Sequence, residues 1–156
     1  FPNPTVDAGH VHYVTFRNGS LAGKRKIIMS YRIDAPRDTK FIPREQPNLP
    51  GTIRLYFQRQ GDKWTGRGRQ RWYRWYAPNA TVRELAPGVY TMEANLNVTG
   101  WLPVSGGMEN GFTEAFNDAL EYADRVGFVM GSRVAAGHGV YTDKQARFTL
   151  LSFDVM

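Results

Sequence analysis

The chain has 156 residues, a length typical of one domain that buries its own core without covalent cross-links. It contains no cysteine, which excludes disulfide bonds, thiolate metal sites and a cysteine nucleophile. A formal net charge of +6 is compatible both with a polyanionic partner and with an ordinary basic surface. No apolar run reaches membrane-spanning length, so we expect no membrane partner.

The first residues bear on the compartment in which the protein works. The chain begins with Phe-Pro-Asn-Pro and has no initiator methionine. Removal of a signal peptide leaves such a start, and so does trimming for expression. From the first of these readings we expect a secreted or periplasmic protein.

Strands dominate the expected elements of the first half. Apolar and polar residues alternate in 10–16, 24–33 and 52–60, which predicts three strands, the last with a polar outer face. Between the second and third of these, residues 34–51 carry four prolines. That number excludes a helix or a central strand, so we expect a long loop or a crossover between sheets.

The second half continues the same pattern. Further strands are predicted at 72–76, 81–85, 89–98, 125–130 and 146–155, and a single helix at 114–123 with Thr113 as its N-cap. Eight or nine short strands, one helix and no alternation of strands with helices predict an all-β fold. We expect an antiparallel β-sandwich of jelly-roll type that forms one domain over residues 1–156.

Residues 64–76 are the most unusual stretch of the chain. They read Trp-Thr-Gly-Arg-Gly-Arg-Gln-Arg-Trp-Tyr-Arg-Trp-Tyr and hold three of the four tryptophans. Aromatic rings stack on sugars and bases, and arginines hold hydroxyl, carboxylate or phosphate oxygens. An extended backbone would also place Arg67, Arg69 and Arg71 along one side. The stretch therefore predicts a site for polysaccharide or single-stranded nucleic acid, although rings that complete the core and the edge of a sandwich explain part of it.

The three histidines are candidates for a metal centre. His10 and His12 share one side of a predicted strand, and His138 lies between two glycines near the other end of the chain. No carboxylate follows the first pair at the spacing of a cupin-like metal motif. For His138 a second interpretation is that its ring bonds to backbone carbonyls of its own loop. We expect no bound metal and no cofactor.

Signatures of catalysis are missing from the sequence. The acidic residues are scattered and form no pair of the kind that glycosidases use. No serine lies in a Gly-x-Ser-x-Gly elbow, and the glycine-rich segments match no phosphate-binding loop. A binding role is therefore favoured over an enzymatic one.

The strand pattern resembles the non-catalytic carbohydrate-binding modules of jelly-roll type. The resemblance is carried by the alternating strands, by the aromatic and basic strand after Gly61-Asp62, and by the close of the chain, where Arg-Val-Gly-Phe at 125–128 precedes a final strand at 146–155. It implies glycan binding by an aromatic platform, in a module often appended to an enzyme. The implied rings are Trp64, Trp72, Trp75 and Tyr76, with Trp101 as a further ring and Arg69, Gln70, Arg71 and Arg74 as hydrogen-bonding partners.

Three functions follow from these observations, in order of preference. The first is non-catalytic polysaccharide binding. The second is a polysaccharide-active enzyme with a metal centre at the three histidines. The third is single-stranded nucleic-acid binding, which the net charge and the mixture of arginines with aromatic residues suggest.

Overall fold

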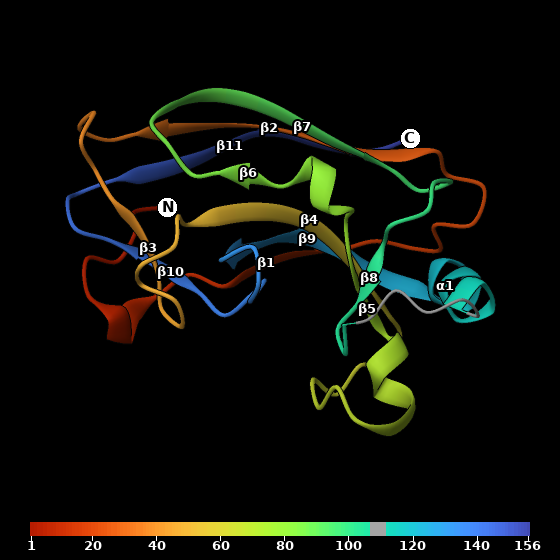
Figure 1. Ribbon diagram of the computed structural model, residues 1–156. Coiled ribbons are helices and arrows are strands. Elements are labelled where there is room, and N and C mark those ends of the chain that lie inside the picture. The colour runs from red at the N-terminus through yellow and green to blue at the C-terminus, as the bar shows by residue number, and fades with distance from the viewer. Residues whose placement is uncertain (107–111) are drawn as a thin grey trace.

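The chain folds into antiparallel sheets, of which the two largest pack face to face (Figure 1). The computed structural model describes residues 1–106 and 112–156. Within these residues there is one α-helix, α1 (Phe112–Glu121), and every strand pairing is antiparallel. The predicted all-β sandwich with one short helix is confirmed, and the jelly-roll order of its connections stays a prediction.

The larger sheet holds six strands. Five follow the spatial order β1 (Tyr13–Arg17), β9 (Ala123–Gly131), β4 (Thr52–Arg59), β5 (Arg74–Tyr76) and β8 (Leu102–Pro103), and the short β6 (Arg83–Glu84) pairs with one end of β4. The smaller sheet has the order β11 (Arg147–Val155), β2 (Lys26–Asp34) and β7 (Gly88–Asn95). In Figure 1 this smaller sheet lies above the larger one.

The core lies between these two sheets because one face of each strand is apolar. Strand β2 turns Ile27, Met29 and Tyr31 inward, all completely buried, and β4 turns Leu55 and Phe57 toward them from the other sheet. Burial of a large apolar side chain stabilises a fold by roughly 2 kcal/mol. The outer face of the smaller sheet is solvated and polar, as its alternation predicts.

Several boundaries differ from the sequence-based expectation. Helix α1 begins at Phe112, so Thr113 lies inside its first turn and is not the N-cap, and Ala123 already belongs to β9. The proline-rich segment contains β3 (Phe41–Pro43), which pairs with β10 (Val140–Thr142) in a small separate sheet. Proline is tolerated there because each strand of a two-stranded ribbon has a free edge.

Helix α1 closes one end of the sandwich. The ring of Phe116 packs edge-to-face against Phe57 and Trp75 and lies 5.9 Å from the ring of Trp101. In the described part of the chain no helix has the length and apolarity needed to cross a membrane.

Candidate ligand-binding site

The face of the larger sheet that points away from the core carries an unexpected set of buried polar side chains. Outward positions on a sandwich sheet are ordinarily solvated, yet Arg54, Tyr56 and Gln58 on β4 are only 4%, 0% and 3% exposed. Tyr56 and Gln58 are covered by segment 61–72, which lies below β5 in Figure 1, and by Val104 and Ala136, whereas Arg54 donates from Nη2 to Oδ1 of Asn79 over 2.6 Å. We call the polar side chains that meet here the outer-face cluster; it comprises Tyr13, Tyr56, Gln58, Asp62, Arg74 and Tyr76.

An ion pair forms the centre of the outer-face cluster. The Nε atom of Arg74 lies 2.8 Å from Oδ2 of Asp62, and the two side chains are 7% and 0% exposed. The Nε–H bond is not directed at that oxygen, so the contact is electrostatic and not a well-formed hydrogen bond. Burial by itself lowers the pKa of Arg74, but the neighbouring Tyr13, Tyr76 and Asp62 outweigh it, and the pKa is raised overall. The guanidinium therefore stays charged.

Three tyrosine hydroxyls surround this ion pair. Arg74 donates from Nη1 to the Tyr13 hydroxyl over 3.2 Å, and that hydroxyl also forms a hydrogen bond with the hydroxyl of Tyr76. The Tyr56 hydroxyl donates to Oε1 of Gln58 over 2.8 Å. Burial raises the pKa of both Tyr56 and Tyr76, with Tyr13 adding to the effect. Both phenols are consequently neutral hydrogen-bonding groups at physiological pH.

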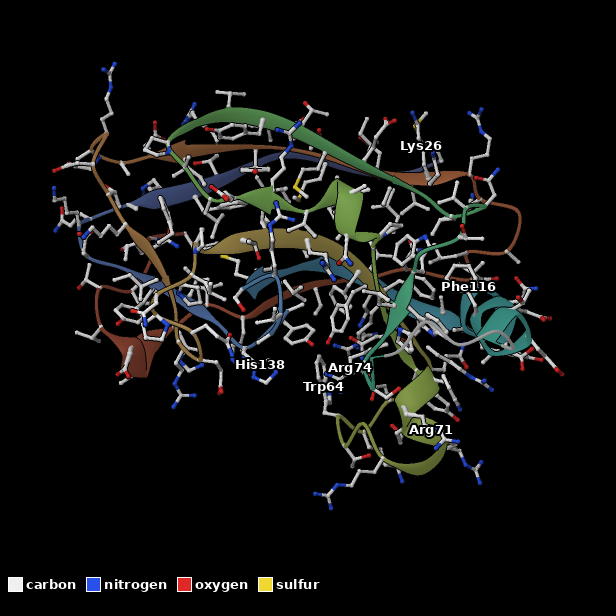
Figure 2. All side chains as sticks on the ribbon, in the orientation of Figure 1. Lys26, Trp64, Arg71, Arg74, Phe116 and His138 are labelled. Carbon is white, nitrogen blue, oxygen red and sulfur yellow. The ribbon has the colours of Figure 1, made fainter. Side chains whose placement is uncertain are left out.

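Trp64 is the exposed member of the site. Its indole is 46% exposed, meets the ring of Tyr13 edge-on at 4.9 Å and has the Arg74 guanidinium 4.6 Å from its ring centre. Figure 2 shows Trp64 and Arg74 together on the side of the larger sheet that faces away from the core. The backbone N–H of Trp64 donates to Oδ1 of Asp62 over 2.9 Å, so the same carboxylate contacts the backbone of this loop and the guanidinium of Arg74.

The backbone at Trp64 has φ of 66°, in the left-handed region. A bulky residue in this region is a conformational outlier that costs of order 1 kcal/mol or more. Trp64 is the only residue other than glycine with positive φ in the described ranges 1–106 and 112–156. The fold thus holds a half-exposed indole in a strained backbone.

Segment 61–72 is fastened by Gln70 and not by strand pairing. Its side-chain amide donates to the carbonyl of Gly61 over 3.1 Å, and its Oε1 accepts from the Lys63 N–H over 2.6 Å. Residues Gly68–Trp72 form a 3₁₀ turn, so the expected extended backbone with Arg67, Arg69 and Arg71 along one side is not what the chain adopts. All three arginines are exposed, but they are spread around a turn.

The other predicted rings are placed differently. Trp75 and Trp101 are 1% and 6% exposed and belong to the core, where both indoles pack against Phe116 of α1 and Trp101 also packs against Phe57. Each indole N–H donates to a backbone carbonyl, that of Trp72 for Trp75 and that of Asn95 for Trp101, over 2.7 and 2.8 Å. Neither presents a face to a ligand. Trp72 is half-buried, with its ring 6.4 Å from Trp75 and the Arg71 guanidinium 4.9 Å from it.

The structure therefore brings together only part of the predicted site. Arg74 and Tyr76 belong to the outer-face cluster, and Trp64 lies against Arg74. Gln70 lies in the loop that carries Trp64, while Arg69 and Arg71 lie on the exposed turn. Sequence reasoning did not single out Tyr13, Tyr56, Gln58 or Asp62 as site residues. Tyr56 and Gln58 belong to the polar outer face predicted for strand 52–60, and that polarity is the signal that could have found them.

The histidines form a separate group. The rings of His10 and His12 lie 4.7 Å apart, and Nδ1 of His138 lies 3.5 Å from a carboxylate oxygen of Glu45. Burial, followed by the charges of His10, Arg44 and His138, lowers the pKa of His12. Among the described residues no three His, Asp or Glu side chains are placed to hold one metal ion.

The cluster can stack on a flat ring and exchange hydrogen bonds at its edge. Trp64 offers the ring, and Tyr13, the half-buried member of the outer-face cluster, offers a hydroxyl group beside it. Comparisons with protein-family models, with curated proteins and with solved structures found no match.

Proposed function

We propose that this protein binds polysaccharide without catalysing a reaction, and that Trp64 is the ring on which a sugar unit stacks. The observation that carries the proposal is the half-exposed indole of Trp64, held in a left-handed backbone and backed by Arg74. Secretion and an appended catalytic domain, which the resemblance to carbohydrate-binding modules implies, form part of the same proposal, as does the jelly-roll order of connections.

Stability alone does not account for the placement of Trp64. A tryptophan stabilises a fold through the area it buries, and this one leaves 46% of its surface exposed. Its backbone conformation adds a cost that a glycine would not carry. Strain of this kind is found where a side chain is held for a purpose other than folding.

The surroundings of the ring supply the polar half of a glycan site. Sugars present hydroxyl groups at the edge of a flat, weakly apolar face, so a receptor needs an aromatic plane with hydrogen-bonding groups beside it. Tyr13 is half-buried, and its hydroxyl lies at hydrogen-bonding distance from both Arg74 and Tyr76. Because Asp62 and Arg74 are already fixed by each other, these groups need little reorganisation on binding.

The test is affinity electrophoresis of the chain in gels that contain neutral or acidic polysaccharides, with salt varied. We expect retardation by at least one class of glycan and loss of that retardation in Trp64→Ala. Truncation of a central aromatic residue typically weakens binding by more than 2 kcal/mol, about thirtyfold.

Tyr122 offers a matched control for this experiment. It is 46% exposed, as Trp64 is, and it also has an arginine over its ring, with the Arg59 guanidinium 5.1 Å from the ring centre. It lies at the junction of α1 and β9, outside the outer-face cluster. Tyr122→Ala should keep the retardation of the unmodified chain. Equal retardation of the Trp64→Ala and Tyr122→Ala variants would refute the proposed site, and no retardation by any glycan would refute the function.

A second candidate function is the binding of single-stranded nucleic acid. The observation in its favour is that Arg67, Arg69 and Arg71 are exposed on the same segment as Trp64. Phosphate contacts release counterions, so binding of this kind falls steeply as salt rises. Retardation by single-stranded DNA that disappears with salt, without retardation by any glycan, would favour this candidate.

A further inference from the structure

We infer that the glycan bound at Trp64 is acidic, and that Arg17 and Arg125 bind its carboxylate groups. This inference rests on the proposed function and adds the chemical class of the ligand to it. It is carried by a row of side chains that crosses four strands of the larger sheet and contains two arginines without an acidic partner.

Strand register defines the row. Arg17 on β1 is opposite Arg125 on β9, Arg125 is opposite Gln58 on β4, and Gln58 is opposite Arg74 on β5. Residues that face each other across antiparallel strands project from the same face of the sheet. The row thus ends at the guanidinium beneath Trp64 and lies in the same face as the outer-face cluster.

The two ends of the row differ in charge balance. At one end, Asp62 neutralises Arg74. At the other, Arg17 and Arg125 are both exposed, and neither forms an ion pair with any acidic residue that the structure describes. Like charges directly opposite each other destabilise a sheet. A bound anion would remove that repulsion, and two guanidiniums on neighbouring strands match the two oxygens of a carboxylate.

The position of this pair relative to Trp64 favours a chain of sugars as the source of the anion. Neighbouring strands are about 4.8 Å apart, so Arg125 lies two strands, or about 10 Å, from Arg74 along the row. A ligand that stacks on Trp64 and reaches Arg125 must therefore extend along the sheet. Single-stranded nucleic acid is less well matched, because successive bases need successive rings and the indoles of Trp75 and Trp101 are in the core.

The experiment compares polygalacturonate with the same polymer after methyl esterification, which keeps the sugar chain and replaces each charged carboxylate by a neutral ester. Affinity electrophoresis is run with both, and with single-stranded DNA, on the unmodified chain and on Arg125→Gln, Arg17→Gln and Trp64→Ala. Arg37→Gln is the matched control, because it removes one positive charge from an exposed site in the connection between β2 and β3.

We expect the unmodified chain to bind polygalacturonate at least tenfold more tightly than its ester, and to lose that preference as salt rises. Arg125→Gln and Arg17→Gln should each weaken binding of the acid about tenfold, since a charge-assisted hydrogen bond is worth roughly that factor. Arg37→Gln should leave binding unchanged.

Each of the remaining outcomes would contradict the inference, and the outcomes can be told apart. Equal binding of acid and ester, lost in Trp64→Ala, would leave the proposed function standing and remove the acidic specificity. Binding of a neutral glycan alone would do the same. Binding of DNA alone would identify the ligand as nucleic acid and not polysaccharide. If neither these polymers nor any neutral glycan retards the chain, both the proposed function and this inference are wrong. Equal losses of affinity for polygalacturonate in Arg37→Gln and Arg125→Gln would show that binding depends on net charge and not on the position of Arg125.

Discussion

Asp62 and Arg74 form an ion pair in which both side chains are withdrawn from solvent, with Nε and Oδ2 2.8 Å apart. In every other ion pair between described residues, both side chains are at least 28% exposed. The second oxygen of Asp62 accepts the backbone N–H of Trp64. One carboxylate therefore fixes the guanidinium on the sheet and the backbone of the loop that carries the exposed ring.

Removal of the charge on Asp62 should be costly for the fold. Asp62→Asn leaves the buried guanidinium of Arg74 without its counter-charge, and breaking a buried pair in this way costs about 3 kcal/mol. Urea denaturation gives the free energy of unfolding of the variant and of the unmodified chain. Asp34→Asn is the control, because it breaks an exposed pair with Arg32, where we expect a loss below about 1 kcal/mol. Equal losses in the two variants would contradict the central role of Asp62.

Two completely buried tyrosines should respond oppositely to loss of their hydroxyl groups. The hydroxyl of Tyr31 has no hydrogen-bond partner among the described residues, whereas that of Tyr56 donates to Gln58 over 2.8 Å. Tyr31→Phe should therefore leave the free energy of unfolding unchanged or raise it by up to about 1 kcal/mol, and Tyr56→Phe should lower it by about 1 kcal/mol. Chemical denaturation of both variants checks the sign. A loss in Tyr31→Phe as large as that in Tyr56→Phe would show that the Tyr31 hydroxyl is satisfied.

Stability should fall in alkaline solution in a way that depends on Tyr76. Burial raises the pKa of this phenol well above its ordinary value of 10.0, so the fold favours the neutral form. Its contribution is complete below pH 10 and is lost as the pH rises from there toward the raised native pKa. We would measure the free energy of unfolding from about pH 9 to about pH 11.5, which includes the start of this loss. It should decline less steeply with pH in Tyr76→Phe than in the unmodified chain. Identical slopes for the variant and the unmodified chain would show that Tyr76 titrates alike in both states.

The sandwich could be predicted because its signal is local. The alternation of Ile27, Met29 and Tyr31 with polar residues fixes which face of β2 is buried, whatever the strand packs against. The short strands β3, β8 and β10 were missed, since a pair such as β3 and β10 is joined by contacts between residues about a hundred positions apart. Propensity over three residues carries no such information.

The site could be predicted only in part, because the identity of a ring does not reveal its direction. Trp64, Trp75 and Trp101 look equivalent in sequence, yet two of them fill the core and one is held outside it by a loop. The exposure of Trp64 depends on the positive φ of its own residue and on a hydrogen bond to Asp62. Neither follows from periodicity. The pairing of Tyr13 with Tyr76, 63 positions apart, follows only from the order of strands in the sheet.

The most direct test of Trp64 as the ligand-binding ring is a titration that follows the indole N–H signals by NMR. The ligand is an oligosaccharide of whichever glycan retards the chain in electrophoresis. The indoles of Trp75 and Trp101 act as internal controls, because both are buried and bonded to backbone carbonyls. We predict that the Trp64 signal shifts with ligand while those of Trp75 and Trp101 stay in place. Saturable binding that leaves the Trp64 signal unmoved would contradict the proposed site.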